Sequence, residues 1–267
     1  MTDKNGSGGG DLPTSLEAAW GLRGRPAKGP KPGLSLERIV AAAVGVAAAD
    51  GLAAVSMGRV AQELGASTMS LYRYVSAKDE LYVLMQEEAL GAPEPLTALA
   101  NGAGWRAALA EWAAAQRSRY HDHLWALRIP IGGPPATPNS IAWWEQGLQA
   151  LEGSGLCEGD KTSVILLVSN FIRSEALMMS DLAAAAVARG MGPEELAASH
   201  ERTLKRLVDP VRHPGVARQL SSGMMSEPDD PEYEFTFGMG VLLDGVAELI
   251  RKAADGPGGQ GGGTKSA

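Results

Sequence analysis

A short stretch near residue 70 carries side chains that suit contact with a nucleic acid. Arg73 can bridge a guanine with two hydrogen bonds or neutralise a phosphate, and Thr68 and Met69 can contact the methyl group of thymine. Tyr72 and Tyr74 offer hydroxyl groups to phosphate, although both tyrosines would also suit a core with a solvated hydroxyl. The candidate DNA-contacting side chains of this stretch are Thr68, Met69, Ser70, Tyr72, Arg73, Tyr74 and Lys78.

The pattern around these residues predicts two short helices that meet at a tight turn. Apolar residues at helical spacing end at Gly65, which accepts the left-handed conformation that stops a helix. Ser67 can cap a second helix from Thr68 to about Val75, with Leu71 on its inner face. Because a helix of under three turns is unstable alone, its neighbours must hold it. Helix, glycine turn and short exposed helix match the helix-turn-helix plan for the major groove of DNA.

The flanking sequence supplies further helices for this head. Ser35 is expected to cap a helix over residues 36–49, and Ser56 caps the first helix of the pair. The Ser56 hydroxyl would also lie where a helix N-terminus attracts phosphate, and pure capping explains it equally well. A fourth helix is predicted over residues 77–90. Lys78 opens it, where a positive charge opposes the helix dipole, so a phosphate partner would explain this lysine.

Over roughly residues 35–90 the chain resembles the TetR family of bacterial transcriptional repressors, and it does so more weakly near the C-terminus. The resemblance implies a ligand-responsive repressor, in which the fourth helix couples the effector to the spacing of two DNA-reading heads. It supports the phosphate-contacting roles of the tyrosines and of Lys78, although the family often has histidine where Tyr74 stands. The residues that carry it are Met57, Val60, Ala61, Leu64, Gly65, Leu71, Tyr72, Lys78, Asp79, Glu80 and Leu81.

The charge distribution agrees with DNA contact at one end of the molecule. The 267 residues carry a net charge of −7. Residues 21–78 hold eight Lys and Arg against three Asp and Glu, hence +5, which leaves −12 on the rest. Arg23 and Arg25 open a basic segment that suits the minor groove, while a solvated linker is the plainer interpretation.

The whole chain is expected to be all-α. We predict a disordered basic arm (1–33), a helix-turn-helix domain (34–80), a larger helical effector-binding and dimerisation domain (81–255) and a disordered tail (256–267). The apolar stripe of the last helix, with Gly238 and Gly240 allowing close approach, would join a homodimer on a palindromic operator. A small apolar or aromatic effector could bind among Trp112, Trp143, Trp144, Phe171 and Met178, each of which would also suit plain core packing.

The sequence offers no catalytic motif, so neither an enzymatic activity nor a cofactor is expected. His121 and His123 would point about 200° apart on a helix, which argues against a metal site. A single cysteine, no signal sequence and no uncharged apolar run of membrane-spanning length favour a cytoplasmic protein without a membrane partner. The alternative hypothesis is a helical small-molecule-binding protein or enzyme with a non-functional DNA-binding head. A third hypothesis is a DNA-binding protein without an effector. The sequence does not distinguish it from a ligand-responsive repressor.

Overall fold

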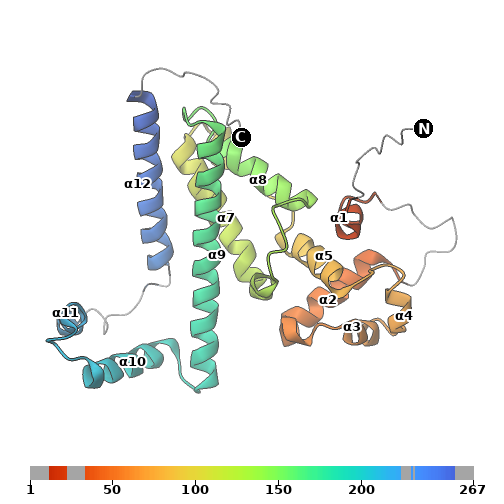
Figure 1. Ribbon diagram of the computed structural model, residues 1–267, viewed down its shortest axis with the longest axis horizontal. Coiled ribbons are helices and arrows are strands. Elements are labelled where there is room, and N and C mark those ends of the chain that lie inside the picture. Colours follow the sequence, from red (N-terminus) through yellow and green to blue (C-terminus); the bar gives the residue numbers. More distant parts are fainter. Residues whose placement is uncertain (1–11, 23–33, 224–229, 231, 256–267) are drawn as a thin grey trace, which may run out of the picture. The chain divides into compact units, whose positions relative to one another are not determined.

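The computed structural model describes residues 12–22, 34–223, 230 and 232–255 (Figure 1). Every regular element in these ranges is a helix, as expected for an all-α chain. The chain divides into two compact units, residues 1–154 and 155–267, which are treated separately. The predicted boundary at residue 80 is a functional division that the structure does not test. The helix that begins at Lys78 packs against helices on both sides of that boundary.

The first unit contains eight α-helices and two short 3₁₀ segments in its described part. They are α1 (Thr14–Ala19), α2 (Leu36–Asp50), η1 (Leu52–Ala54), α3 (Met57–Glu63), α4 (Thr68–Leu71), α5 (Lys78–Leu90), α6 (Thr97–Ala100), α7 (Trp105–Asp122), η2 (Leu124–Arg128) and α8 (Pro138–Ala150).

One continuous core holds the head of this unit together. It buries apolar side chains from α2, α3, α4 and α5. Val55 and Val75, in the short connections, are also fully buried there. The 3₁₀ segment η2 contributes Trp125 and Ala126 to the same cluster, together with Ile129 just after it. The head is therefore not an independent module, because η2, the segment that follows α7, packs directly into the core of the head.

Residues 12–22 correct the expectation that the chain lacks structure before residue 34. They form the short helix α1, which packs against α5, and Ala18 and Ala19 pack against the core of the head. The indole N–H of Trp20 donates to the carbonyl of Ala136 at 2.8 Å. The small side chains of Ala18 and Ala19 let α1 pack closely against α5. The composition of this segment did not predict a packed helix. The rest of the predicted arm lies outside the described residues.

The segment between α5 and α7 also differs from the predicted connection, because it contains α6. Its first turn is held by the carboxylate of Glu111 on α7, which accepts from the backbone N–H of Thr97 and of Ala98 and from the Thr97 hydroxyl. The Ala98 N–H, followed by the hydroxyl and N–H of Thr97, lowers the pKa of Glu111. This cap was not predicted, because the accepting carboxylate of Glu111 lies 14 residues after Thr97, outside the local sequence pattern.

Helix α8 packs against α5 and is also hydrogen-bonded to the residue that follows α5. The backbone N–H of Asn139 donates to the Glu87 carboxylate at 2.8 Å, and its side-chain amide donates to the Glu87 carbonyl at 3.0 Å. The indole of Trp143 donates to the carbonyl of Gly91, the C-cap residue of α5. These hydrogen bonds join α8 to the last turn of α5 and to its C-cap residue, and so they fix α5 to α8.

The second unit consists of four helices in its described part: α9 (Glu158–Ala188), α10 (Pro193–Leu207), α11 (Pro214–Ser222) and α12 (Tyr233–Asp255). Helix α9 packs against α12 and α10. It is long and apolar enough to cross a membrane, a property shared by core helices of soluble proteins, and it carries Arg173 and Glu175. Helix α11 was not predicted.

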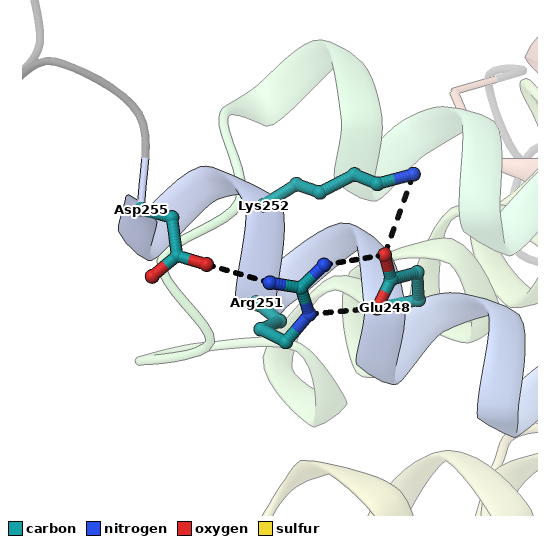
Figure 2. Close-up of polar contacts among 4 residues, drawn as sticks. All are labelled: Glu248, Arg251, Lys252 and Asp255. Atoms are coloured by element: carbon teal, nitrogen blue, oxygen red, sulfur yellow. Dashed lines mark hydrogen bonds and ion pairs between the residues drawn. The ribbon is translucent and has the colours of Figure 1, made fainter.

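A cluster of charged side chains lies at the C-terminal end of α12 (Figure 2). Arg251 contacts Glu248 at 2.7 Å and Asp255 at 2.7 Å, and Lys252 lies 3.4 Å from Glu248. Chiefly through the hydrogen bond from Arg251, the pKa of Glu248 falls to about 2. These side chains are solvent-exposed, so water and salt screen the ion pairs and they contribute little to stability.

Only one of the two glycines predicted to allow close approach is needed for packing within the chain. A Cβ atom on Gly238 would overlap the ring of Phe171 on α9, whereas a Cβ on Gly240 would meet nothing within 4 Å. The Phe171 ring also stacks on Phe235, with centroids 6.2 Å apart. The absence of a side chain at Gly238 therefore lets the phenyl ring lie against the backbone of α12.

We expect Gly238→Ala to destabilise the protein by about 1–3 kcal/mol, because the new methyl group displaces a packed ring. Gly240→Ala is the matched control. In the same helix interior it should be neutral or stabilise by about 0.5–1 kcal/mol, since alanine is the better helix former. Thermal and denaturant unfolding of the two variants measure the difference. Equal stability of both variants would show that Phe171 moves aside without cost.

Candidate nucleic-acid interface

The turn between α3 and α4 is built by side-chain caps and one glycine. The Ser56 hydroxyl accepts from the N–H of Arg59 at 3.2 Å, and the Ser67 hydroxyl accepts from the N–H of Ser70 at 3.2 Å. Gly65 has φ of 60°, the left-handed conformation that favours glycine. The caps predicted at Ser35, Ser56 and Ser67 are all present. Helix, turn and helix thus form the expected head.

Helix α4 is shorter than predicted. It ends at Leu71, and the N–H groups of Tyr74 and Val75 both bond to the Leu71 carbonyl, which tightens the last turn. Leu71 is fully buried in the head core, whereas Met69 is 74 % exposed. Tyr72 and Arg73 are exposed, and Thr68 and Ser70 are half-buried. The Ser67 and Ser70 hydroxyls lie 2.7 Å apart. The structure thus leaves Met69, Tyr72 and Arg73 accessible from solvent.

Tyr74 has a structural contact that the sequence did not reveal. Its hydroxyl donates to the carbonyl of Leu34 at 3.0 Å, and the side chain is half-buried against the head core. This contact ties the turn after α4 to the residue that precedes the Ser35 cap. In this structure the Tyr74 hydroxyl serves packing, and a phosphate contact at this position is a prediction that no observation tests.

Removal of that hydroxyl should have a small and specific effect. We expect Tyr74→Phe to cost about 0.5–1.5 kcal/mol of stability, the usual value of one intramolecular hydrogen bond. Tyr72→Phe, at an exposed neighbouring position, is the matched control for stability and should change it by less than about 0.5 kcal/mol. Chemical denaturation of both variants gives the two values. A larger loss at Tyr72 than at Tyr74 would contradict the assigned roles.

Lys78 is the first residue of α5 and is exposed. Its ammonium group lies 5.1 Å from the centre of the Tyr82 ring, a cation–π contact that positions the charge at the start of the helix. The carboxylate of Glu80 accepts from the N–H of Ser76 at 2.7 Å and so fixes the chain just before α5. This hydrogen bond was not predicted from the sequence, because the spacing from Ser76 to Glu80 is one residue longer than that of a capping box, and the N-cap residue Ala77 makes no side-chain cap.

The positive charges of the head are not equivalent. Arg59 pairs with Asp50 at 3.2 Å and with Glu63 at 2.9 Å, so nearby carboxylates already neutralise it. Arg73 and Lys78 are both exposed, and Lys78 contacts only an aromatic ring among the interactions seen. This contrast favours Arg73 and Lys78 as the charges that meet phosphate or base. Arg23 and Arg25 lie outside the described residues, so the proposed basic arm stays a prediction.

The residues proposed for an effector site are divided between the two units. Trp112 and Trp143 are buried in the first unit with ring centroids 6.5 Å apart, and the Trp112 indole donates to the Trp143 carbonyl at 3.0 Å. Both indole N–H groups are thus already engaged, Trp143 with Gly91. Trp144 is partly exposed, and Phe171 and Met178 belong to the second unit. Packing explains the two buried tryptophans, and their predicted role as ligand contacts is untested.

The described residues contain no group of three or more His, Cys, Asp or Glu side chains that could hold a metal ion. His123 is the C-cap residue of α7, just beyond the helix that carries His121. Cys157, which its type predicts to be a small buried residue, is instead exposed at the N-cap of α9.

Known proteins that match the DNA-binding head and the helical region after it are transcriptional regulators. Residues 39–85 match the family described as "Bacterial regulatory proteins, tetR family", and residues 98–250 match "Tetracyclin repressor-like, C-terminal domain". The HTH-type transcriptional repressor DrrR1 of Streptomyces coeruleorubidus is 34 % identical over 245 residues, which is 91 % of this chain and 88 % of DrrR1. The chain belongs to the TetR family of transcriptional regulators.

Solved structures agree with this assignment. Apo ActR of Streptomyces coelicolor superposes with a TM-score of 0.65 and 27 % identity, covering 81 % of this chain and 98 % of ActR. ActR bound to actinorhodin gives a TM-score of 0.67 over the same shares of the two chains. A third ActR structure contains (S)-DNPA. The ActR structures thus share the fold and include two complexes with small molecules.

Proposed function

We propose that this protein is a homodimeric repressor that binds a palindromic operator and leaves it when a small molecule binds. The observation that carries the proposal is the exposed side of α4. Met69 on α4, and Tyr72 and Arg73 directly after it, are exposed to solvent, while Leu71 of the same helix is buried in the core. A recognition helix held in this way can enter the major groove with its base-reading side chains free. The proposal places the protein in the cytoplasm, with no catalytic activity.

Apolar surface on the second unit supports the homodimer. Helix α12 exposes Phe237, Val241 and Leu249, while Met239, Leu243 and Val246 are buried. Helix α9 likewise exposes Leu166, Leu167 and Leu182. Large exposed apolar surface on a folded protein often marks a protein interaction site. A two-fold partner on these helices would place two α4 helices on the two halves of a palindrome.

Release by an effector requires that the small molecule bind the DNA-incompetent state more tightly than the DNA-bound state. ActR, a relative of the same fold, has been solved with actinorhodin and with (S)-DNPA. These two compounds are therefore suitable first probes for an effector of this protein.

A gel-shift with the purified protein and its own upstream DNA tests the proposal. At fixed moderate salt and with excess nonspecific competitor, we expect a discrete complex that persists. The same assay, repeated with each of the two compounds, then measures release. If the upstream DNA gives no complex, selection from a randomised DNA pool replaces it. Failure to enrich any sequence would contradict a functional DNA-binding head and favour a small-molecule-binding protein with an inactive head.

The role of Lys78 gives a separate prediction. Lys78→Ala should weaken binding to all DNA sequences alike, and the slope of log affinity against log salt should become shallower by about 0.9, the value for one phosphate contact. Asp79→Ala is the control, because it alters the same helix turn without removing a positive charge. An unchanged salt slope in Lys78→Ala would exclude a phosphate contact at this lysine.

A further inference from the structure

The N-terminal helix α1 contacts two elements that lie far from it in the sequence. It packs against α5, and its two C-terminal alanines are partly buried against the core of the head (Figure 1). Just after the helix, the indole N–H of Trp20 donates to the carbonyl of Ala136 at 2.8 Å. Ala136 directly precedes Thr137, the N-cap residue of α8. Residues 14–20, the N-terminal strap, therefore connect α5 to the start of α8.

The backbone at the end of α1 fixes the place of Trp20. The N–H of Leu22 bonds to the carbonyl of Glu17 at 2.8 Å. The N–H of Gly21 bonds to the carbonyl of Ala18 at 3.1 Å. Together with the left-handed φ of 63° at Gly21, these two bonds form a Schellman motif. The helix thus ends in a defined turn, and the indole that reaches the start of α8 belongs to an ordered helix terminus.

Helix α5 is the element that this strap can control. It packs against α2 in the head and against α7 and α8 in the helical region that follows. Two groups of α8 bond to the end of α5: the N–H of Asn139 donates to Glu87, and the Trp143 indole donates to the Gly91 carbonyl at 2.9 Å. A change in the contact between α5 and α8 therefore shifts the head, and with it α4, relative to α7 and α8.

The N-terminal strap is weakly held. Helix α1 has six residues, buries none of them fully and has no side-chain cap at its N-terminus. So short a helix is unstable on its own, and its contacts with the rest of the unit keep it folded. Trp20 remains 45 % exposed. Because elements with few buried contacts open at a free energy well below that of global unfolding, the strap can leave α5 while the core of the head stays folded.

We propose that the N-terminal strap is a detachable element that regulates DNA binding by holding α5 against the start of α8. With the strap in place, α5 keeps one position and presents α4 in one orientation. With the strap detached, a smaller fraction of dimers holds both α4 helices at the spacing of the two half-sites. The apparent affinity for the operator falls with that fraction. The proposal rests on the proposed function, because operator binding is what the strap regulates.

The test uses the full-length protein and substitutions within one short segment. Ala19→Glu places a charged side chain between α1 and the core of the head, and so detaches the strap, while glutamate remains a good helix former. Leu22→Glu is the matched control, because it adds the same charge at a position that is 63 % exposed. Trp20→Phe is a milder variant that keeps an aromatic ring and removes the N–H that bonds to Ala136.

Hydrogen exchange of three indole N–H groups, followed by NMR, measures the effect without DNA. Trp20 reports on the strap, and Trp143 reports on the contact between α8 and the end of α5. Trp112 is the internal reference, because it bonds to the Trp143 carbonyl and joins α7 to α8. In Ala19→Glu we expect exchange at Trp20 and Trp143 to become roughly three- to tenfold faster, with Trp112 unchanged. Trp20→Phe should accelerate exchange at Trp143 by a smaller factor, and Leu22→Glu should leave all three rates unchanged.

Gel-shift titration of the same proteins gives the affinity for the operator. Ala19→Glu should weaken operator binding about three- to tenfold, whereas Leu22→Glu keeps the wild-type affinity. Unchanged exchange at Trp143 in Ala19→Glu would overturn the inference, whatever the protein does with DNA. Equal losses of affinity in the two glutamate variants would overturn it as well, because charge alone would explain them, and so would unchanged or tighter binding by Ala19→Glu. A wild-type protein that binds no operator would contradict the proposed function, while exchange at Trp143 would still decide whether the strap holds α5.

Discussion

Leu71→Ala should destabilise the protein by about 2–5 kcal/mol and abolish specific DNA binding. Leu71 is completely buried, and it is the only fully buried residue of a helix that spans four residues. So short a helix has no stability of its own, and the burial of Leu71 holds it in the head core beside α3. Truncation leaves a cavity in the head core and releases the helix that presents Arg73.

Met69→Ala on the same helix is the matched control. Met69 is exposed, so its truncation should change stability by less than about 0.5 kcal/mol while it still weakens operator binding. Denaturant unfolding and gel-shift titration of both variants separate folding from recognition. Wild-type stability of Leu71→Ala would mean that other contacts hold α4 in place.

Arg73→Ala should weaken operator binding by about 1–3 kcal/mol, roughly five- to 150-fold, if the guanidinium reads a guanine. Arg73 is exposed just after α4, in the part of the head that a major groove would meet. A base contact predicts that the variant also loses discrimination between the operator and point-mutated operators. A phosphate contact predicts uniform weakening across all sequences instead.

Arg59→Ala is the control for Arg73→Ala, because it removes the same charge from the same head. Arg59 is already paired with Asp50 and Glu63, so its removal should affect DNA binding far less. Competition gel-shifts against a set of operator variants provide the measurement. Equal losses in the two arginine variants would point to net charge rather than a specific contact.

Local signals allowed much of the head to be predicted before its structure was known. Ser35, Ser56 and Ser67 were expected to cap three helices, and each hydroxyl accepts a hydrogen bond from a backbone N–H in the first turn of its helix. Gly65 was expected to stop α3, and it has the left-handed backbone. Caps and glycine stops act within a few residues, so the sequence contains everything they require. Helical periodicity likewise predicted an all-α chain.

Contacts between distant residues could not be predicted in this way. The cap of α6 by Glu111, the hydrogen bond from Tyr74 to Leu34 and the docking of α1 on α5 each join segments far apart in the chain. Nothing in the local pattern distinguishes a tyrosine that faces phosphate from one that reaches a carbonyl 40 residues away. The roles of these residues were therefore open until the helices were packed.

By itself, then, the sequence predicted the helices of the head, the turn between α3 and α4, and candidate residues for DNA contact. Tertiary structure decided which of those side chains are free. In the folded protein Arg59 forms an ion pair with Asp50, and the Tyr74 hydroxyl donates to the carbonyl of Leu34. Met69, Tyr72 and Arg73 remain exposed. It also engages the indole groups of Trp112 and Trp143 while leaving that of Trp125 unpaired. The reason is physical: helix formation follows from local hydrogen bonds and periodicity, whereas the availability of a polar atom depends on every neighbour that packing brings to it.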